Sequence, residues 1–513
     1  MVNITLPNIT IPQISPDVLN DTLRILNKTR QGPVTVPNAP AIPPWLENAL
    51  LTIYLALLAL SILLIAHYIY YARHSSRQPP DLRADPADAP LSIIIPVKNE
   101  SPETVAQAVK RLAALNCPDA EIIVVSDDPP DAFEEIRKAV ESLAVPNAKA
   151  LRRPQPVGYK GVALNWAAER ARGEILLFLD VDSVPPPDLC HRARAVGERE
   201  ILFLGWDGYA PVKTPIATLQ LFLYKYLLFH VAIVGRHNTG HPIFALGSGI
   251  AVRKKFLQEM GGFCNCTADD YDISMKAYLH GGRVVYSPGV PVYVEVPGGY
   301  AAFKKQYARW TYNSAYLLAA YGLKIFRLWM PLPHRISVFL NVATHPLMIM
   351  TTFAIMLSGL AMGYMGILLP PLHILILQLA LGIAALVQVY YVYKLARRDG
   401  HSFVAVAGKL AKSAALLLVL SPYLAFYVVL GTLRRRIRWH ITPKGLASVL
   451  SGRAGPYEIG LAAALGALFA YALTTANPVF ITNTAFLLAA TLYVLTKITS
   501  PPPRSDATQS GTG

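Results

Sequence analysis

The stretch "GEILLFLDVDSVPPPDL", residues 173–189, joins a continuous apolar run to two carboxylates directly behind it. The run "ILLFL" has the length and composition of a buried strand. Asp180 and Asp182 follow at an i, i+2 spacing, which places both side chains on the same side of an extended chain. Two carboxylates that point at one spot favour a cation there, so the stretch predicts a strand that ends at a metal site. An acidic turn that only ends the strand is the alternative.

Similar apolar runs precede this stretch, and helical segments separate them. The runs cover residues 91–98, 120–128 and 148–154. Between them lie "PETVAQAVKRLAAL", "DAFEEIRKAVESL" and "KGVALNWAAERAR", each with apolar residues at helical spacing. Alternating strands and helices predict a mostly parallel α/β sheet with helices on both faces, whose ligands bind at the carboxyl ends of the strands.

Acidic residues follow three of these predicted strands. Glu100 comes after the first strand, and Asp127 and Asp128 end the second. With Asp180 and Asp182 they form an oxygen-rich edge that suits Mg²⁺ or Mn²⁺ together with a phosphate-bearing ligand. The sequence contains neither G-x-x-x-x-G-K-[ST] nor G-x-G-x-x-G, so a P-loop and a dinucleotide cradle are excluded.

The composition indicates a membrane protein. Of 513 residues, 53% are hydrophobic and 15% are charged, which is too apolar for an ordinary soluble protein. The net charge of +15 fits lysine and arginine on the cytoplasmic side of a membrane, and we predict no nucleic-acid partner. The four cysteines are expected to be reduced structural thiols, because "CNC" lacks a second zinc-binding pair.

The first membrane span is predicted at residues 45–71. Basic residues in "ARHSSRQ" follow it, which places this end in the cytoplasm and the N-terminus outside. Four N-x-T sequons in the N-terminal tail, at Asn3, Asn8, Asn20 and Asn27, agree with an exported tail, although a disordered polar tail explains them equally well.

Hydrophobic segments return at 336–366, 371–396, 404–433, 457–475 and 478–498. The connectors "GILLPPLH" and "TTANPVF" lack lysine and arginine and are predicted outside, whereas "KLARRDGH" and "LRRRIRWHITPKG" are basic and predicted inside. Every connector falls on its preferred side if 404–433, with its Ser-Pro break, is an interfacial or re-entrant element and five segments span. A sixth span is the alternative.

Seven short motifs now occur in a fixed order: "IIIPVKNE", "VVSDDPPD", "GYKGVALNWA", "FLDVDSV", "GSGIAVRKKFLQEMGGF", "ADDYDISMKAYLHGGRVVY" and "KQYARWTYN". Their order resembles the processive membrane enzymes of glycosyltransferase family 2, the cellulose, chitin, hyaluronan and mannan synthases. The resemblance covers roughly residues 88–320 and implies a cytoplasmic GT-A domain. "QYARW" is its most specific part, since it is similar to the Q-x-x-R-W signature of these enzymes.

The resemblance implies a role for each matching donor-site residue. Glu100 and one of Asp127 or Asp128 would contact the nucleobase and ribose, and Lys160 the diphosphate. Asp180 and Asp182 would form the D-x-D pair that holds Mg²⁺ or Mn²⁺, with Asp182 favoured as the direct ligand.

For the acceptor side, the resemblance implies that Asp270 is the general base and that Gln306, Arg309 and Trp310 form the Q-x-x-R-W site. The family's T-E-D is "ADD" here, so Ala268 and Asp269 depart from the pattern. "RWHITPKG", residues 438–445, resembles a gating loop that would bring Thr442 and Lys444 to the diphosphate. A plain basic cytoplasmic loop is the alternative.

The resulting organisation has six parts. They are an extracellular tail (1–45), a transmembrane helix (46–72), a GT-A domain (85–300), an amphipathic interfacial region with QxxRW (301–330), a C-terminal transmembrane region (335–498, including the interfacial segment 404–433 and the cytoplasmic loop 434–456) and a cytoplasmic tail (499–513).

The predicted function is inverting hexosyl transfer from a nucleotide-diphosphate sugar to a growing β-linked polysaccharide, coupled to export through the cell membrane. UDP-glucose is favoured by resemblance alone, while N-acetylglucosamine and mannose donors remain open. The alternative is a non-processive enzyme that makes a glycolipid or a polyprenyl-phosphate sugar. A third hypothesis, a non-catalytic export subunit, is disfavoured because the acid set is intact.

One further segment, "RHNTGHP" at 236–242, offers His237 and His241. A metal site there is disfavoured because no third ligand is near in sequence, and a loop near the acceptor is the preferred interpretation. The aromatic run 224–230 is interpreted as a buried helix face that could line the acceptor path.

Overall fold

The fold is that of a computed structural model, which describes residues 42–115, 117, 119–367, 372–437, 443, 445–450 and 455–499. The sequon-bearing tail, the C-terminal residues after 499, Thr442 and Lys444 lie outside the described residues.

The central sheet contains seven strands in the order β3-β2-β1-β4-β7-β5-β8. The four strands predicted from apolar runs are β1 (Leu91–Val97), β2 (Glu121–Ser126), β3 (Ala148–Arg152) and β4 (Ile175–Phe178), and their parallel pairing is confirmed. The remaining strands are β5 (Glu200–Phe203), β7 (Ile250–Arg253) and β8 (Arg283–Tyr286). Since β7 runs antiparallel to both β4 and β5, the sheet is mixed. A parallel pair, β6 (Trp206–Tyr209) and β9 (Val292–Glu295), forms a second small sheet.

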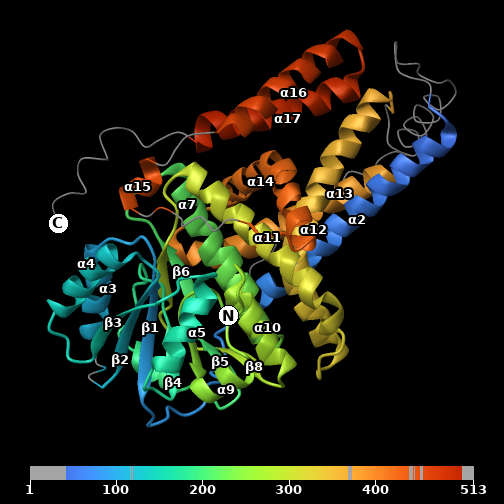
Figure 1. Ribbon diagram of the computed structural model, residues 1–513. Helices are drawn as coiled ribbons and strands as arrows, with labels where there is room; N and C mark the ends of the chain where they lie inside the picture. The colour runs from blue at the N-terminus through green and yellow to red at the C-terminus, as the bar shows by residue number, and fades with distance from the viewer. Residues whose placement is uncertain are drawn as a thin grey trace, which may run out of the picture.

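Helices cover both faces of the sheet, as predicted (Figure 1). One face is packed by α3 (Pro102–Ala113), α4 (Pro130–Glu141) and α6 (Leu189–Arg194), and the other by α5 (Lys160–Arg170), α9 (Lys254–Glu259) and α10 (Asp269–Leu279). Neighbouring residues of one strand enter opposite cores, because side chains alternate along a strand. Ile93 and Ile95 join one core and Ile94 the other.

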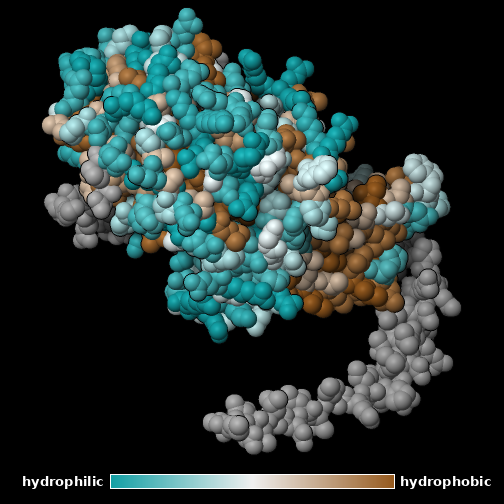
Figure 2. All heavy atoms as spheres, turned by 90° about the horizontal axis from the view of Figure 1, so that it is seen from below, coloured by the Kyte–Doolittle hydropathy of each residue, from teal (hydrophilic) through white to brown (hydrophobic). Residues whose placement is uncertain are grey.

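Seven helices among the described residues are long and apolar enough to cross a membrane, by length and composition. Figure 2 shows hydrophobic side chains gathered at one end of the molecule, whereas the rest of this face is mostly hydrophilic. Six of the helices match the hydrophobic segments found in the sequence. They are α2 (Pro44–His74), α12 (Leu332–Tyr364), α13 (Leu372–Ala396) with η2 (Arg397–Asp399), α14 (Phe403–Thr432), α16 (Pro456–Thr474) and α17 (Pro478–Tyr493) with η3 (Val494–Ile498).

The seventh helix lies where the sequence predicted no candidate span. It runs through α7 (Pro215–Phe222), η1 (Leu223–Gly235) and α8 (Arg236–Asn238). Its most apolar window is 56% buried within the protein, and η1 packs against β6, α2 and α13. Its hydrophobic composition therefore serves packing between the sheet region and the long helices.

The Ser-Pro break expected in the segment 404–433 is absent, because α14 continues through Ser421 and Pro422. Proline lacks the N–H that would bond the carbonyl of Leu418 four residues earlier. The hydroxyl of Ser421 donates to that carbonyl instead, at 2.9 Å. The repaired helix is long enough to span, so the break no longer argues for an interfacial element; which topology holds stays a prediction.

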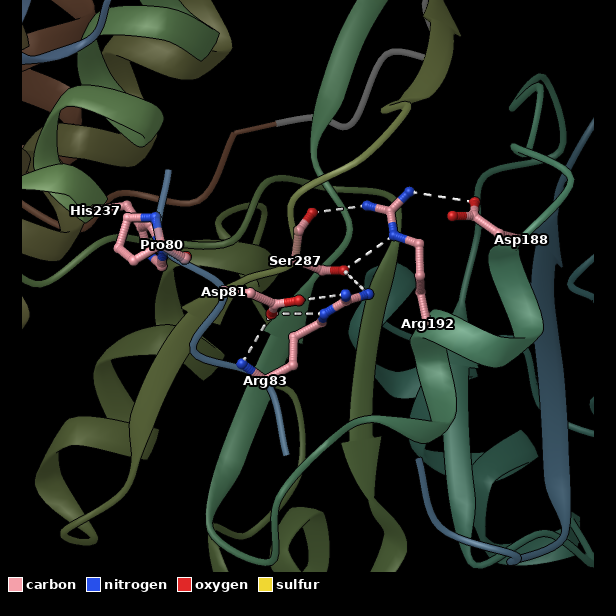
Figure 3. A network of polar contacts seen from close by, with 7 residues as sticks. All are labelled: Pro80, Asp81, Arg83, Asp188, Arg192, His237 and Ser287. Atoms are coloured by element: carbon pink, nitrogen blue, oxygen red, sulfur yellow. Dashed lines mark hydrogen bonds and ion pairs between the residues drawn. The ribbon is translucent and has the colours of Figure 1, made fainter. Parts of the chain in front are cut away.

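Polar contacts fix the segment that leaves α2 to the sheet domain (Figure 3). The carbonyl of Pro80 lies 2.8 Å from His237 Nε2, and Arg83 donates to the hydroxyl of Ser287 at 3.4 Å. The same hydroxyl accepts from Arg192 Nε at 2.9 Å. The segment that follows α2 is thereby held to both the sheet domain and α8.

The expectation of reduced thiols is wrong for this structure. Cys117 is bonded to Cys190, and Cys264 to Cys266.

Candidate active site

One cavity of about 1030 Å³ begins at the carboxyl ends of β1, β2 and β4 and continues between α2, α12, α13 and α14. It brings together most of the predicted site residues. Glu100, Asp127, Lys160, Asp180, Asp182, Asp270, Gln306, Arg309 and Trp310 all line it. The strand-end acids and the QxxRW residues, which lie far apart in sequence, therefore face one space.

Asp180 and Asp182 lie directly after β4, although the chain there forms a turn and is not extended as the sequence suggested. The backbone N–H of Ser183 closes this turn by donating to the carbonyl of Asp180 at 3.0 Å. The Asp180 carboxylate accepts from Lys160 Nζ at 2.9 Å, and Asp182 accepts from the backbone N–H of Glu295 at 3.4 Å. The turn, rather than strand alternation, brings both carboxylates to the cavity.

Gly247 leaves room between two of the acids. A Cβ atom at this position would lie 3.7 Å from Asp180 Oδ2 and 3.8 Å from Asp270 Oδ2. Its carbonyl accepts from Lys160 Nζ at 3.0 Å, and its N–H donates to Asp270 Oδ2 at 2.9 Å. A side chain here would enter the space that a ligand of these acids needs.

The two adjacent acids after β2 have different surroundings. Asp127 lines the cavity and is held by Arg153, whose Nε and Nη2 each lie 2.6 Å from a carboxylate oxygen. Asp128 instead accepts from the N–H of Asn99 at 2.6 Å and from the hydroxyl of Ser126 at 2.7 Å. Asn99 has φ +54°, a conformation that this contact supports, next to Glu100. Of the two candidates, Asp127 is the one on the cavity wall and Asp128 positions the loop.

Asp269, which is buried, and Asp270, which is half-buried, start α10. Burial is the largest cause that raises the pKa of Asp269. The charge of Lys160 lowers this pKa, and the charge of Asp180 raises it further. Burial and then the neighbouring charge of Asp269 raise the pKa of Asp270 to about 6. Burial alone would lower the pKa of Lys160. The net effect is nevertheless a raised pKa, because the negative charges of Asp180, Asp269 and Asp270 outweigh the effect of burial. At neutral pH Asp270 is therefore a largely ionised carboxylate whose proton affinity is higher than usual, which suits a general base.

The helix α11 (Tyr300–Ile325) carries Gln306, Arg309 and Trp310 to the same cavity. The Gln306 amide oxygen accepts from the Tyr224 hydroxyl at 2.9 Å. Tyr224 also links two indole rings, with centroids 4.7 Å from Trp206 and 5.6 Å from Trp310. The three rings form an aromatic group at the cavity wall.

The middle of α11 is tied to the segment just before the acids by a contact that the sequence did not suggest. Thr267 donates to the Asn313 side-chain oxygen at 2.5 Å, and the Asn313 amide donates to the carbonyl of Thr267 at 2.7 Å. Tyr224 and Gly247 were also missed as individual residues, since only their partners in space reveal them; the motif "GSG" was the one sequence signal for Gly247.

The two predicted gating residues, Thr442 and Lys444, lie outside the described residues, but their described neighbours reach the site. Pro443 lines the cavity. The short helix α15 (Gly445–Leu450) is docked, because the N–H of Gly445 donates to Glu295 and the Ser448 hydroxyl accepts from Gly298 N–H at 2.8 Å. This segment therefore contacts the last residue of β9 and the residues that follow the strand.

A second cluster with metal-binding side chains consists of Cys264, Cys266 and Asp272. Its cysteines are joined to each other, and Asp272 lies 3.1 Å from Lys276 Nζ. Disulfide sulfurs are not the thiolates that bind metals, so this cluster is not a metal site here.

Comparison with known families and proteins gives consistent matches. Residues 92–257 match Glycosyl transferase family 2, and residues 175–429 match Glycosyl transferase family group 2. A Sulfolobus acidocaldarius protein described as a probable glycosyltransferase is 27% identical over 364 residues, covering 69% of this chain and 77% of that protein.

Plant proteins are also similar. The probable glucomannan 4-beta-mannosyltransferase 14 of Arabidopsis thaliana is 27% identical over 267 residues, which is 48% of either chain. This chain therefore spans about half the length of that relative. Among solved structures, the mannosyltransferase PcManGT from Pyrobaculum calidifontis, in complex with GDP-Man and Mn²⁺, has 17% identity and a TM-score of 0.47 and covers 75% of this chain and all of its own.

Proposed function

Because this chain is a glycosyltransferase with a family 2 domain of GT-A fold, we propose that it transfers a hexose from a nucleotide-diphosphate sugar to a glycan acceptor at a membrane, with inversion at the sugar C1. The observation that carries the proposal is the single cavity that holds the D-x-D carboxylates, Asp270 and the QxxRW residues together.

A divalent cation fits the donor end of the cavity. Asp180 and Asp182 offer carboxylate oxygens on one wall, and Gly247 leaves the space beside Asp180 open. Such oxygen donors suit Mg²⁺ or Mn²⁺ bound together with phosphates. When bound, the ion would neutralise charge on the departing nucleotide diphosphate. Glu100 and Asp127 would contact the nucleoside, and Lys160 would add positive charge at the diphosphate.

The transfer itself needs one base and a fixed acceptor. Asp270 takes the proton of the acceptor hydroxyl, whose oxygen forms the new bond to C1 as the bond from C1 to the diphosphate oxygen breaks. Arg309 is half-buried near Asp269, Asp270 and Asp180 and supplies positive charge to the leaving group. Trp310, with Tyr224 and Trp206, provides an apolar platform for the acceptor sugar.

The continuation of the cavity between the long helices supports a path for the product and so a processive enzyme that exports a β-linked glycan. In this proposal the sheet domain is cytoplasmic, the N-terminus is outside, and α2 crosses the cell membrane. The names of the plant relatives favour a mannosyl donor over the UDP-glucose suggested by the sequence. Transfer of a single sugar to a lipid remains the competing function.

Product analysis tests these points together. Membranes with the full chain would receive Mn²⁺ and labelled GDP-mannose, UDP-glucose or UDP-N-acetylglucosamine, beside Asp270→Asn and Asp272→Asn variants. We expect a long polymer from one donor, absent with Asp270→Asn and present with Asp272→Asn. A short lipid-extractable product would replace the processive proposal with single transfer, and no product from any donor would contradict the proposed activity.

A further inference from the structure

The cavity contains a buried guanidinium that has no carboxylate beside it. Arg236, at the start of α8, is 3% exposed and lines the cavity. Its Nη1 donates to Ser337 Oγ at 2.7 Å and to the Ser337 carbonyl at 3.2 Å, and its Nη2 lies 3.0 Å from His67 Nε2. The guanidinium stacks over the Tyr71 ring, 4.3 Å from its centroid. Throughout the described part of the chain, no aspartate or glutamate forms an ion pair with it.

Arg192 shows what a buried arginine of the same chain looks like when its charge is balanced (Figure 3). It is 1% exposed, lies 3.5 Å from a carboxylate oxygen of Asp188 and donates to the carbonyls of Leu204 and Ser287 at 2.7 Å each. An arginine buried without a counter-charge is strongly destabilising. The difference indicates that an anion from outside the chain balances Arg236.

The groups around Arg236 are polar and carry no negative charge, so its own positive charge is not balanced by them. The Tyr71 hydroxyl, 3.4 Å from Arg236, is 3.1 Å from His241 Nδ1, and the His241 ring is 5.3 Å from that of His334. Burial and then the charges of His334 and Arg236 lower the pKa of His241. Tyr271, the residue after the proposed base, lines the same cavity and is within electrostatic reach of Arg236. An anion bound here would therefore lie within reach of the residue next to the proposed base.

Most of the cavity wall between the long helices is aliphatic, although polar side chains such as Asn341 and Gln388 also line it. It is formed by helices that are candidates for membrane spans, through Leu64, Ile65, Leu227, Val231, Leu340 and Leu381. A neutral glycan could accept hydrogen bonds from the guanidinium but could not balance its charge, and a free anion would gain nothing from the aliphatic part of the wall. The combination fits an amphiphile with a phosphate at one end and a hydrocarbon chain at the other.

We propose that Arg236 binds the phosphate of a lipid-linked acceptor and that the hydrocarbon chain of this lipid lies along the aliphatic wall. The inference rests on the proposed function only in naming the lipid as acceptor, and it holds for one transferred sugar or many. The phosphate satisfies the guanidinium with charge-assisted hydrogen bonds, while the lipid-borne end group reaches Asp270.

Binding to the full chain in neutral detergent micelles, without divalent metal, tests the site directly. Farnesyl phosphate is the probe, farnesol is its uncharged match, and inorganic phosphate and phosphatidylglycerol vesicles are competitors. We expect farnesyl phosphate to bind at least about tenfold more tightly than farnesol, since a hydrogen-bonded charge pair is lost with the phosphate. Arg236→Gln should abolish this preference, and Arg236→Lys should keep part of it. Arg192→Gln is the control, and its folded fraction should keep the full preference.

Equal binding of farnesol and farnesyl phosphate to the unaltered chain overturns the proposal, and this comparison needs no variant to fold. So does an unchanged preference in Arg236→Gln, or displacement by inorganic phosphate or phosphatidylglycerol as effective as by farnesyl phosphate itself. Donor turnover is measured in the same preparations with metal restored. If the unaltered chain prefers farnesyl phosphate over farnesol but turns over no donor, only the proposed function is refuted. If it turns over donor without that preference, only the lipid site is refuted.

Discussion

The acid limb of the pH profile of activity should report the adjacent pair Asp269 and Asp270. Burial and the Asp269 charge raise the pKa of Asp270 to about 6, and a general base works only when it is unprotonated. The kcat/KM of the enzyme should therefore fall as the pH drops through about 6. Replacing Asp269 with asparagine removes one of the two causes, so the limb should move to lower pH.

The size of the effect follows from the pKa. With a pKa of about 6, roughly 90% of Asp270 is ionised at pH 7 and roughly 10% at pH 5, which predicts about a tenfold fall in kcat/KM. The Asp269→Asn variant should keep a larger share of its own plateau at pH 5. Removing the base itself, in Asp270→Asn, should lower the plateau by about 10²- to 10⁴-fold and leave no limb at this pH.

The assay is release of nucleoside diphosphate at saturating metal between pH 4.5 and 8, with each variant scaled to its own maximum. Asp272→Asn is the matched control, because Asp272 belongs to the same helix but bonds Tyr321 and Lys276 and does not line the cavity. Its limb should coincide with that of the unaltered enzyme. A limb that stays in place in Asp269→Asn, or that moves equally in Asp272→Asn, would refute the assignment of the limb to the Asp269–Asp270 pair.

Three further substitutions separate contact from positioning. Tyr224→Phe removes the hydroxyl that donates a hydrogen bond to Gln306. The loss of this neutral hydrogen bond should lower kcat/KM about two- to tenfold and leave the affinity for the nucleotide sugar unchanged, as measured by initial rates. Asp128→Asn weakens the support of Asn99, so the donor KM should rise; an unchanged KM would assign Asp128 no part in the loop. Ser448→Ala removes the hydroxyl that accepts a hydrogen bond from Gly298 and so holds α15. Amide hydrogen exchange in α15 should become faster, while the KM for the glycan acceptor stays constant.

The strands that carry the acids were predictable because their signal is local. A strand buried on both faces by helices must be apolar along its length, and the runs at β1, β2 and β4 have this form. Their parallel pairing follows from the intervening helices and places their ends at one edge. Asp180 and Asp182 could therefore be assigned to the site before any tertiary contact was known.

The choice between Asp127 and Asp128 could not be made in the same way. Both residues are acidic, adjacent and buried, and their sequence signals are identical. What separates them is the position of Arg153 after the neighbouring strand and the left-handed conformation of Asn99. Neither feature leaves a trace in the local pattern, because each depends on how two separate loops meet.

For α14 the expectation from the sequence is wrong, because a neighbouring residue compensates for the helix-breaking effect of the proline. A proline inside an apolar segment usually interrupts a helix. Here Ser421 supplies the hydrogen bond that Pro422 cannot, so a repaired helix and a broken one look alike in the sequence until the serine hydroxyl is placed. A Ser-Pro pair is therefore weak evidence against a span in a segment this apolar.

Arg236 escaped notice because burial of a charge is a property of its neighbours. In "RHNTGHP" the histidines attracted the interpretation, yet His237 bonds the carbonyl of Pro80 and His241 the hydroxyl of Tyr71. The groups that enclose Arg236 lie 101 to 169 residues away along the chain, on α2 and α12. The packing of α2 and α12 around Arg236 leaves its charge unbalanced on a cavity wall. The same packing places Arg236 beside the aliphatic surface. The two halves of the proposed lipid site are thus produced by one packing event, which is why the sequence shows neither.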